Sequence, residues 1–489
     1  MGGTAVAEDL AARGVNVLAI EAGNEQPDDA RAVDESTGTP LRLRRYRAVE
    51  LGGGSNLWHG VCSPLDDVDF MTRSWIPDSG WPIARSDLVP YYERATAAME
   101  IGSYRHFDFD TLSDGIDRAR DIVFDTSVLS GKLFQFRDRA LRLKPRWRDL
   151  ISTRKLRCLT DTRALELVCD EAGGRVSHVK IGAGERRATV HARAFVVCAG
   201  ALETPRLLLN SVSRHPAGIG NDRGVVGRYL LDHPAGHFQG LAFARMVRAP
   251  LFSKLRIAPN VNLMMGLTLS AALQAEHRLP NHYLFVRPRI SARRVDPAFL
   301  TSLVGVRGLR DLKMKELLQL ADPHVFYRVA VQRLGLPAFY RYADLFFMTE
   351  QMPSRDSFVA LSQRRDSFGY PIARVNWKLS EADHAAFERF ARLALERGLG
   401  GPSYRVIAPD SFADWRERVS SAAHFLGTAR MADDPSRGVV DRNLRVFGTE
   451  NLFVCDGAVF PTAGSTNPSF TIFALGLRLA AHLKAFLER

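Results

Sequence analysis

The pattern of apolar and polar residues at the N-terminus predicts a helix followed by a buried strand. Apolar side chains recur at helical spacing from residue 2 through Leu10, and Gly14 is well placed to end the helix. A short, mostly apolar run follows over residues 15–20 and ends at the acidic residue Glu21. A helix that leads into a buried strand is the second half of a β-α-β unit.

The same segment carries part of a dinucleotide-binding motif. In that motif a strand precedes G-x-G-x-x-G, and an acidic residue about 20 positions onward hydrogen-bonds ribose hydroxyls. Gly3 fits the third glycine and Glu21 fits the acid, whereas the first strand and the first two glycines are absent from the sequence. We expect a start placed too late, rather than a shortened chain or a protein that does without this strand.

Other segments show the pattern of strands in an α/β domain. Residues 194–198 are apolar and lead through a glycine turn into a helix with a proline near its start. Residues 451–457 form a similar strand, and an apolar helix follows over residues 471–487. Residues 162–169 and 176–181 are predicted as two strands joined by a glycine-containing turn.

The α/β pieces are spread along the chain, which predicts one nucleotide-binding domain interrupted by insertions. We assign residues 1–85, 150–235 and 410–489 to this discontinuous domain. Residues 86–149 are predicted as a helical lid or linker, and residues 236–409 as a substrate-binding domain. The predicted fold class is therefore α/β: a Rossmann-like domain whose first strand is missing, with an inserted domain built on an antiparallel β-sheet with helices.

Within the inserted domain, β-branched and aromatic enrichment predicts strands. The predicted strands are residues 238–247, 282–290, 344–352 and 357–363. Helices are predicted over residues 380–399 and 297–340. The second of these mixes cations with leucines on one projection, so we favour a solvated helix over one that touches a membrane or a partner.

Charge and cysteine usage narrow the function classes. The formal net charge is +12, but Lys and Arg are scattered over many segments without a nucleic-acid-binding motif, so we expect no nucleic-acid partner. The five cysteines form no C-x-x-C pair and no cluster at metal-ligand spacing, which predicts reduced thiols and no metal site. No apolar run approaches the roughly 18 residues needed to span a bilayer, and no leader precedes the first helix. We expect a cytoplasmic protein without membrane contact.

Specific motifs extend along most of the chain. Residues 51–60 read LGGGSNLWHG, residues 200–205 read GALETP, and residues 227–234 read GRYLLDHP. The region 424–471 contains HFLGTARM, DGAVFPT and NPSFT. Together with the partial motif at Gly3, these stretches resemble the glucose-methanol-choline (GMC) family of flavin-dependent oxidoreductases, in its bacterial branch of pyranose oxidase-like, sugar-oxidising and glycoside-oxidising enzymes.

The resemblance implies a catalytic pair formed by His424 and Asn467. In the family the matching residues lie side by side beneath the substrate alcohol. His424 would accept the hydroxyl proton while the carbon-bound hydride leaves for flavin N5, and Asn467 would orient the same oxygen. An imidazole suits this task because its ordinary pKa lies near 6.5. His233, in the segment 227–234, is expected to be structural rather than catalytic.

The resemblance also implies that FAD is the cofactor. The first glycines of residues 51–60 would let backbone N–H groups approach a planar ring or a phosphate. The helix beginning near Thr471 would direct its N-terminal dipole toward the flavin. Thr204 stands where the family usually has serine and keeps a hydroxyl. The expected cofactor-binding residues are Gly3, Glu21, Gly52, Gly53, Gly54, Ser55, Asn56, Trp58, Gly60, Gly200, Asp456, Gly457, Ala458, Asn467, Pro468 and Thr471.

We expect the flavin to be held without a covalent bond. Some relatives attach it through a histidine in the glycine-rich stretch, and Leu57 occupies the position that pyranose oxidases use. His59 lies close enough in sequence to keep covalent attachment an alternative.

The substrate expectation rests on resemblance alone. Residues 80–83, 87–92 and 350–353 are similar to segments of bacterial sugar-oxidising enzymes, which favours a sugar, glycoside or polyol. Glu350 and Gln351 could bind its hydroxyls, although a structural role is at least as well supported. The alternatives are a non-sugar alcohol, a flavin-containing lyase, or a flavin-free pseudoenzyme. The electron acceptor stays open among oxygen, a quinone and a redox protein.

Overall fold

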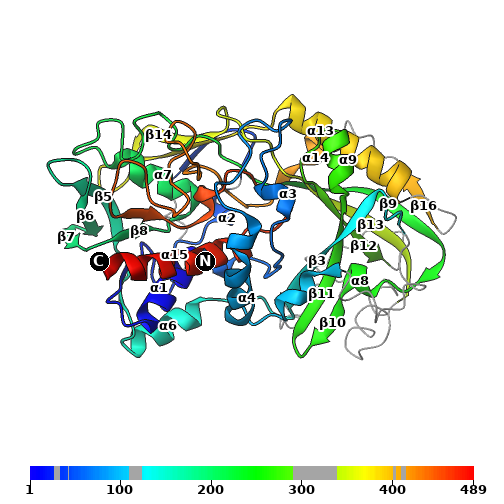
Figure 1. The fold of residues 1–489 in the computed structure, drawn as a ribbon, viewed down its shortest axis with the longest axis horizontal. Coiled ribbons are helices and arrows are strands. Elements are labelled where there is room, and N and C mark those ends of the chain that lie inside the picture. The colour runs from blue at the N-terminus through cyan, green and yellow to red at the C-terminus, as the bar shows by residue number, and fades with distance from the viewer. Residues whose placement is uncertain are drawn as a thin grey trace, which may run out of the picture.

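The chain folds into two parts that lie side by side in the computed structural model (Figure 1). One part is α/β and contains both ends of the chain, and the other is built on one large, mostly antiparallel sheet. The predicted α/β class with an inserted antiparallel sheet is therefore confirmed. The structure describes residues 1–26, 34–41, 43–109, 124–289, 339–399, 404–408 and 415–488.

The N-terminal helix and strand form as predicted. Helix α1 spans Gly2–Ala12, and strand β1 spans Leu18–Ile20. Gly14 adopts a φ of +75° between them, a left-handed conformation that ends helices at low steric cost. Strand β1 pairs in parallel with β4 (Arg157–Leu159).

The α/β part contains a second pair of parallel strands. Strand β8 (Phe195–Val197) pairs with β18 (Leu452–Val454), and the helices α7 (Gly200–Asn210) and α15 (Ser469–Leu487) follow these strands. Over the described ranges, no strand pairs with both β1 and β8, so the parallel strands stay in two separate pairs.

Helix α15 is the central helix of the α/β part. It packs against α1 and α4 (Val89–Ala98), and a side chain at Gly476 would collide with Ala5 at 2.7 Å. By length and composition alone α15 could cross a membrane, with a mean hydropathy of 1.5, which corrects our expectation that no segment approached that limit. More than half of it is buried inside the protein, as in a core helix.

An antiparallel sheet covers one end of the α/β part. Its order is β5-β6-β7, with bounds Arg163–Cys169, Val176–Ala183 and Arg186–His191. The first two strands were predicted from their apolar pattern. Strand β7 was missed because its residues are mostly exposed and show no apolar periodicity.

The large sheet forms the second part. Its main order is β10-β11-β12-β13-β9-β16, and β3 also pairs with β11 while β17 pairs with β9. Three of the predicted strands, now β9, β12 and β13, are confirmed. The bounds are β3 (Leu129–Arg137), β9 (Pro234–Val247), β10 (Leu255–Ala258), β11 (Val261–Leu269), β12 (Tyr283–Arg289), β13 (Tyr340–Met348), β16 (Tyr404–Ala408) and β17 (Ser420–Ser421).

Two assignments within the insertions differ from the sequence analysis. Strand β3 lies inside residues 86–149, which were predicted as helical, and its nine-residue register along β11 makes it part of the large sheet. Strand β14 (Phe358–Arg365) was predicted for that sheet but instead pairs with β15 (Pro371–Trp377) in a separate sheet with β2 (Asp34–Gly38). The predicted helix over residues 297–340 lies almost wholly outside the described residues.

The two faces of the large sheet carry different packing. Along β12, Leu284 and Val286 point to a core covered by α13 (Glu381–Leu393), a predicted helix that is confirmed. Tyr283 and Phe285 point to the opposite face, into a smaller apolar cluster that also contains Val61 and Ala422. Side chains alternate along a β-strand, so these two residues share the second face of the sheet. Val61 belongs to the α/β part, so this second face is the one turned toward that part.

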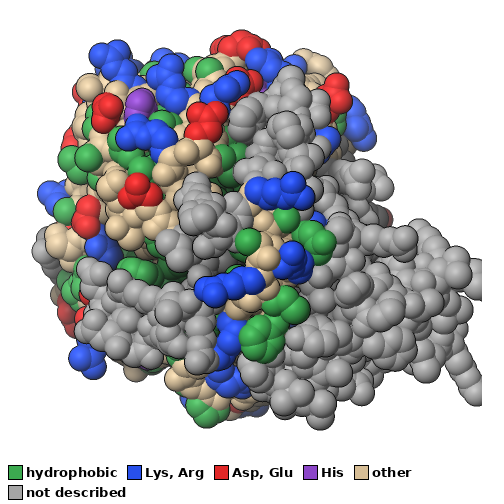
Figure 2. Space-filling view, turned by 90° about the vertical axis from the view of Figure 1, so that its right-hand side faces the viewer, with side chains coloured by type: hydrophobic (Ala, Val, Ile, Leu, Met, Phe, Trp, Pro, Cys, Tyr) green, Lys and Arg blue, Asp and Glu red, His purple; other side chains and the backbone are tan. Residues whose placement is uncertain are grey.

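The remaining short helices lie in the connections. They are α2 (Leu43–Tyr46), α3 (Asp67–Phe70), α6 (Lys144–Ser152), α8 (Pro250–Ser253), α9 (Ala271–Glu276) and α14 (Trp415–Arg418). On the end of the molecule that carries the large sheet, Lys and Arg side chains stand among hydrophobic and acidic ones (Figure 2). Among the described residues of that face, Lys and Arg side chains are spread over several places rather than gathered in one block.

Candidate active site

The two residues predicted as a catalytic pair lie together in the structure. His424 follows β17, and Asn467 directly precedes α15. The side-chain nitrogen Nδ2 of Asn467 lies 3.2 Å from His424 Nε2. Each residue is placed by the end of a regular element, so the geometry of the pair is set by two rigid neighbours.

A buried carboxylate fixes the backbone around His424. Asp232 is fully buried, and its Oδ1 accepts hydrogen bonds from the backbone N–H of His233 at 2.7 Å and of His424 at 2.8 Å. The Ser421 hydroxyl donates to the other oxygen, Oδ2. Burial raises the pKa of Asp232 to about 6, because these donors only partly offset the cost of burying a charge. One side chain therefore holds two histidines that are far apart in sequence.

The rings of His233 and His424 are hydrogen-bonded to each other. Their Nδ1 atoms lie 3.0 Å apart, and the rings meet edge to face. His233 Nε2 lies 2.9 Å from the backbone oxygen of Gly464. Burial lowers the pKa of His233 to about 4, so its imidazole is neutral near pH 7.

His424 is also neutral near pH 7. Burial lowers its pKa well below the ordinary value, and the neighbouring His233 and His59 lower it further. A neutral imidazole has one nitrogen that can accept a proton. The site therefore combines a half-buried proton acceptor with an amide that can bind the same substrate oxygen.

Three of the predicted cofactor-binding glycines border open space. A Cβ atom added to Gly53, Gly54 or Gly200 would meet no other atom within 4 Å. Gly53 and Gly200 also have positive φ values, +51° and +83°, which favour glycine. Backbone that is open in this way lets a flat ring or a phosphate approach closely, so these positions fit a dinucleotide.

Gly3 and Glu21 occupy the places that a dinucleotide motif requires. A Cβ atom on Gly3 would lie 3.2 Å from the side chain of Cys198, so Gly3 permits close packing of α1 on β8. The carboxylate of Glu21 accepts a hydrogen bond from the Gly23 N–H at the end of β1. The described residues thus supply the helix and the acid of the motif.

The other members of the glycine-rich stretch hold this loop in place. Ser55 Oγ donates to the Gly52 carbonyl and accepts from the Leu143 N–H, and Trp58 Nε1 donates to the Leu141 carbonyl. Asn56 donates to the Leu51 carbonyl. These contacts make them supports for the loop. Gly52 and Gly60 pack closely against neighbouring residues, because an added Cβ would lie 2.9 Å from Lys144 and from Ala140 respectively.

Asp456 joins the two strand-to-helix turns of the β8-β18 pair. Its Oδ2 accepts hydrogen bonds from the Gly200 N–H at 2.9 Å and the Thr204 hydroxyl at 2.6 Å, and its Oδ1 accepts from the Ala458 N–H at 2.7 Å. The hydroxyl retained at Thr204 therefore has a defined partner. Gly457 lies against the backbone next to His424, since an added Cβ would be 2.6 Å from the Phe425 carbonyl.

The start of α15 is also held from within. Pro468 is the residue at its N-terminal boundary, and the Thr471 hydroxyl shares a 2.8 Å hydrogen bond with the Tyr92 hydroxyl. This fixes the helix end that follows Asn467.

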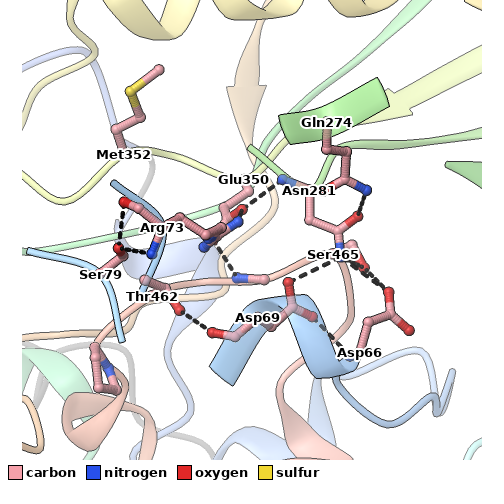
Figure 3. A network of polar contacts seen from close by, with 12 residues as sticks. Asp66, Asp69, Arg73, Ser79, Gln274, Asn281, Glu350, Met352, Thr462 and Ser465 are labelled. Atoms are coloured by element: carbon pink, nitrogen blue, oxygen red, sulfur yellow. Dashed lines mark hydrogen bonds and ion pairs between the residues drawn. The ribbon is translucent and has the colours of Figure 1, made fainter. Parts of the chain in front are cut away.

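The two residues offered as substrate contacts are engaged inside the protein (Figure 3 shows Glu350). Glu350 forms a two-pronged ion pair with Arg73, at 2.6 and 2.7 Å, and both side chains are 1% exposed. It also accepts from the backbone N–H of Asn281 and of Gly464. Because four donors fill its carboxylate, Glu350 is a structural residue here.

Gln351 is occupied in the same way. Its Oε1 accepts from the Asp232 N–H and the Trp377 indole, and its Nε2 donates to the Lys378 carbonyl. The sequence had left a structural role open for both residues, and the contacts of the structure favour that role.

A second pair of acids completes this network (Figure 3). The Asn281 side-chain amide donates to Asp66, Asp69 and Ser465, and Lys132 forms an ion pair with Asp66. Burial and the neighbouring carboxylates raise the pKa of Asp69 to about 7. Through the contact with Ser465, the network holds the segment just before Asn467 in place.

Sequence reasoning missed the functions of several residues around the site. Asp232 was not singled out, although it lies beside His233 in the segment 227–234 that carried the family resemblance, the one signal available. Arg73 and Asp69 lie in a segment without any recognised motif. Their importance depends on contacts with residues more than 200 positions away.

Two family models match the chain. Both are described as GMC oxidoreductase, one for the N-terminal region over residues 144–235 and one for the C-terminal region over residues 353–476. The second match includes both His424 and Asn467.

Curated relatives are enzymes that oxidise alcohols. The chain is 26% identical to 2-methyl-1,2-propanediol dehydrogenase of Mycolicibacterium austroafricanum, over 90% of this chain and 78% of that protein. It is 24% identical to paromamine 6'-oxidase of Streptomyces fradiae, over 98% of this chain and 88% of that protein.

A solved structure shares the fold. The pyridoxine 4-oxidase from Mesorbium loti superposes with a TM-score of 0.55 over 99% of this chain and 97% of that one, at 18% identity.

Proposed function

Because the chain belongs to the GMC oxidoreductase family, whose members bind FAD and oxidise alcohol groups, we propose that it oxidises a CH–OH group of a sugar, glycoside or polyol with His424 as the proton acceptor. The observation that carries the proposal is the half-buried, neutral imidazole of His424 with Asn467 at 3.2 Å.

The chemistry follows from the two side chains. An alcohol carbon gives up hydride readily only as the oxygen loses its proton, and FAD supplies the hydride acceptor when bound. His424 Nε2 takes the hydroxyl proton, which becomes an N–H of an imidazolium. Asn467 Nδ2 donates a hydrogen bond to the same oxygen and orients it. General-base assistance of this kind is typically worth about 10² to 10⁴ in rate.

The described residues can hold the cofactor without a covalent bond. Gly53, Gly54 and Gly200 offer open backbone, Glu21 can bind ribose hydroxyls, and Gly3 allows α1 to pack close to β8. Leu57 stands where some relatives carry the linking histidine. We therefore propose a non-covalent flavin, which acid precipitation tests because it releases a non-covalent flavin into the supernatant.

The substrate class rests on the relatives. Paromamine 6'-oxidase is a sugar-type oxidase, which favours a sugar, glycoside or polyol. A non-sugar alcohol is the second candidate, because another relative is named for 2-methyl-1,2-propanediol. The apolar cluster of Phe134, Tyr283, Phe285 and Met348 on the sheet face toward the α/β part is consistent with either.

Anaerobic absorbance measurements test the function. The FAD-loaded protein is mixed with sugars, glycosides, polyols and simple diols, and the flavin bands are followed. We expect one class to bleach the bands, and His424→Ala to slow bleaching about 10²- to 10⁴-fold. His178→Ala, on the distant sheet β5-β6-β7, is the control and should bleach at the parent rate. Full activity in His424→Ala would contradict the assignment.

A further inference from the structure

The Gly464 carbonyl, His233 and His424 form a row of hydrogen-bonded groups that ends at His424 Nε2, the nitrogen that faces Asn467. The Gly464 carbonyl oxygen lies 2.9 Å from His233 Nε2, His233 Nδ1 lies 3.0 Å from His424 Nδ1, and His424 Nε2 lies 3.2 Å from Asn467 Nδ2. Each contact in this row needs one donor and one acceptor. The positions of the protons can therefore be worked out from one end.

The Gly464 carbonyl determines which ring nitrogen of His233 carries the proton. A carbonyl oxygen can only accept, so His233 must carry a hydrogen on Nε2. His233 is neutral near pH 7, because burial lowers its pKa to about 4, and the Gly464 carbonyl and the Glu350 charge offset only part of this effect. A neutral imidazole has a single N–H, so His233 Nδ1 has a free lone pair and accepts a hydrogen bond.

The position of the proton on His424 follows from its position on His233. Since His233 Nδ1 accepts, His424 must donate through Nδ1–H. His424 is also neutral, so its Nε2 carries no hydrogen. Asn467 then meets this lone pair with its amide N–H, the donor arrangement in the structure.

The backbone of the two histidines and of Gly464 is held in place by buried carboxylates. Asp232 Oδ1 binds the backbone N–H of both histidines, and the two rings meet at 84° with centroids 5.1 Å apart. Gly464 donates its own N–H to Glu350. It has a φ of +67°, and a Cβ atom there would lie 2.4 Å from Leu65, so the position suits only glycine.

We propose that His233 is a positioning residue that holds His424 in the tautomer with its proton on Nδ1, leaving Nε2 free to accept the substrate hydroxyl proton. The catalytic role of this tautomer rests on the proposed function. The tautomer itself is a property of the protein alone and can be measured without substrate. When the hydroxyl proton arrives, His424 carries hydrogens on both nitrogens, and its Nδ1–H remains bonded to His233.

Nitrogen NMR of the FAD-loaded protein tests the tautomer directly. In protein labelled with ¹⁵N-histidine, two-bond ¹H–¹⁵N correlations distinguish a protonated from a bare ring nitrogen. The His424 signals are identified by their absence in His424→Ala. We expect a protonated Nδ1 and a bare Nε2 near pH 7. A protonated Nε2 in the parent protein would overturn the proposal without any further variant.

Two substitutions at His233 then separate positioning from packing. His233→Leu removes both ring nitrogens, and we expect His424 to populate the Nε2–H form and flavin reduction to slow about 10- to 100-fold, with little change in substrate Kd. His233→Gln keeps one donor and one acceptor, so it should restore the Nδ1–H tautomer and most of the rate. An unchanged His424 spectrum in His233→Leu would contradict the proposal.

His282→Leu is the matched control. His282 is another fully buried imidazole with a lowered pKa, and its Nδ1 accepts from the Glu350 N–H rather than contacting His424. This variant should leave the His424 signals unchanged. If the NMR result holds but His424→Ala retains its full rate of flavin reduction, the proposed function fails while the tautomer assignment stands.

Discussion

Two buried polar clusters lie on either side of the segment that leads to Asn467, and they are built in opposite ways. The first cluster is formed by Asp232, His233 and His424, and the second by Arg73 and Glu350 with their partners. In the second, Glu350 receives four hydrogen bonds and keeps no capacity for a ligand. In the first, two neutral imidazoles leave one lone pair at His424 Nε2, which the Asn467 amide faces and which can still accept a proton.

The difference separates a network that only supports the structure from one that fits the proposed proton transfer. A saturated ion pair resists change, because removal of either partner strands a buried charge. An imidazole with one free nitrogen can take a proton without breaking its other contact. The clusters meet at Gly464, whose N–H binds Glu350 and whose carbonyl accepts from His233. The saturated cluster can therefore support the cluster that we propose to be catalytic.

Breaking the ion pair should have the largest effect on stability. Arg73→Met leaves the Glu350 carboxylate buried without its cation, and we expect a loss of about 3–5 kcal/mol in the free energy of unfolding. Urea denaturation monitored by tryptophan fluorescence measures it. The double variant Arg73→Met with Glu350→Gln removes the stranded charge and should recover part of the loss. A double variant as unstable as the two single losses added would show that the charge is not the cause.

Removal of Asn467 should instead affect rate more than stability. Asn467→Ala deletes a donor to the substrate oxygen, and we expect flavin reduction to slow about 10- to 100-fold. The free energy of unfolding should change by less than about 1 kcal/mol, because Asn467 is only half buried. Stopped-flow absorbance and urea denaturation measure the two quantities. A large loss of stability with an unchanged rate would assign Asn467 to the structural cluster.

The sequence pointed to members of the first cluster more readily than to those of the second. His424 and Asn467 sit in motifs that carry the resemblance to the GMC family, and that resemblance implied the pair. The Arg73–Glu350 pair joins residues 277 positions apart, and neither lies in a motif that pairs them. Glu350 was therefore offered for substrate hydroxyls, whereas its partner could be identified only from the fold.

The same limit explains the errors in the fold. The strands β9, β12 and β13 show strong apolar or aromatic enrichment and were predicted. Strand β3 was included in a helical segment, although its partner β11 stabilises it as a strand through a register of nine residues. Pairing between distant segments overrides local preference in such cases.

The smallest predicted effect concerns pH and sharpens the comparison within the first cluster. The pKa of Asp232 is raised to about 6 in the folded protein, above its ordinary value near 3.9. The folded state therefore holds this proton more tightly than the unfolded state, so this group's contribution to stability falls as the pH rises from about 4 to about 6, and is constant above.

Asp232→Asn tests that contribution, because the amide keeps an acceptor for the His233 and His424 N–H groups and cannot ionise. Relative to Asp232→Asn, the parent should lose stability between pH 4.5 and pH 7, measured by urea denaturation at both values. Asp366→Asn is a suitable control: the ion pair with Arg206 lowers the pKa of Asp366 below its ordinary value, so this carboxylate is ionised in both the folded and the unfolded state above about pH 4.5, and the difference between parent and variant should stay nearly constant from pH 4.5 to pH 7. An Asp232→Asn difference that does not vary with pH would mean that Asp232 stays ionised, making the first cluster charged like the second.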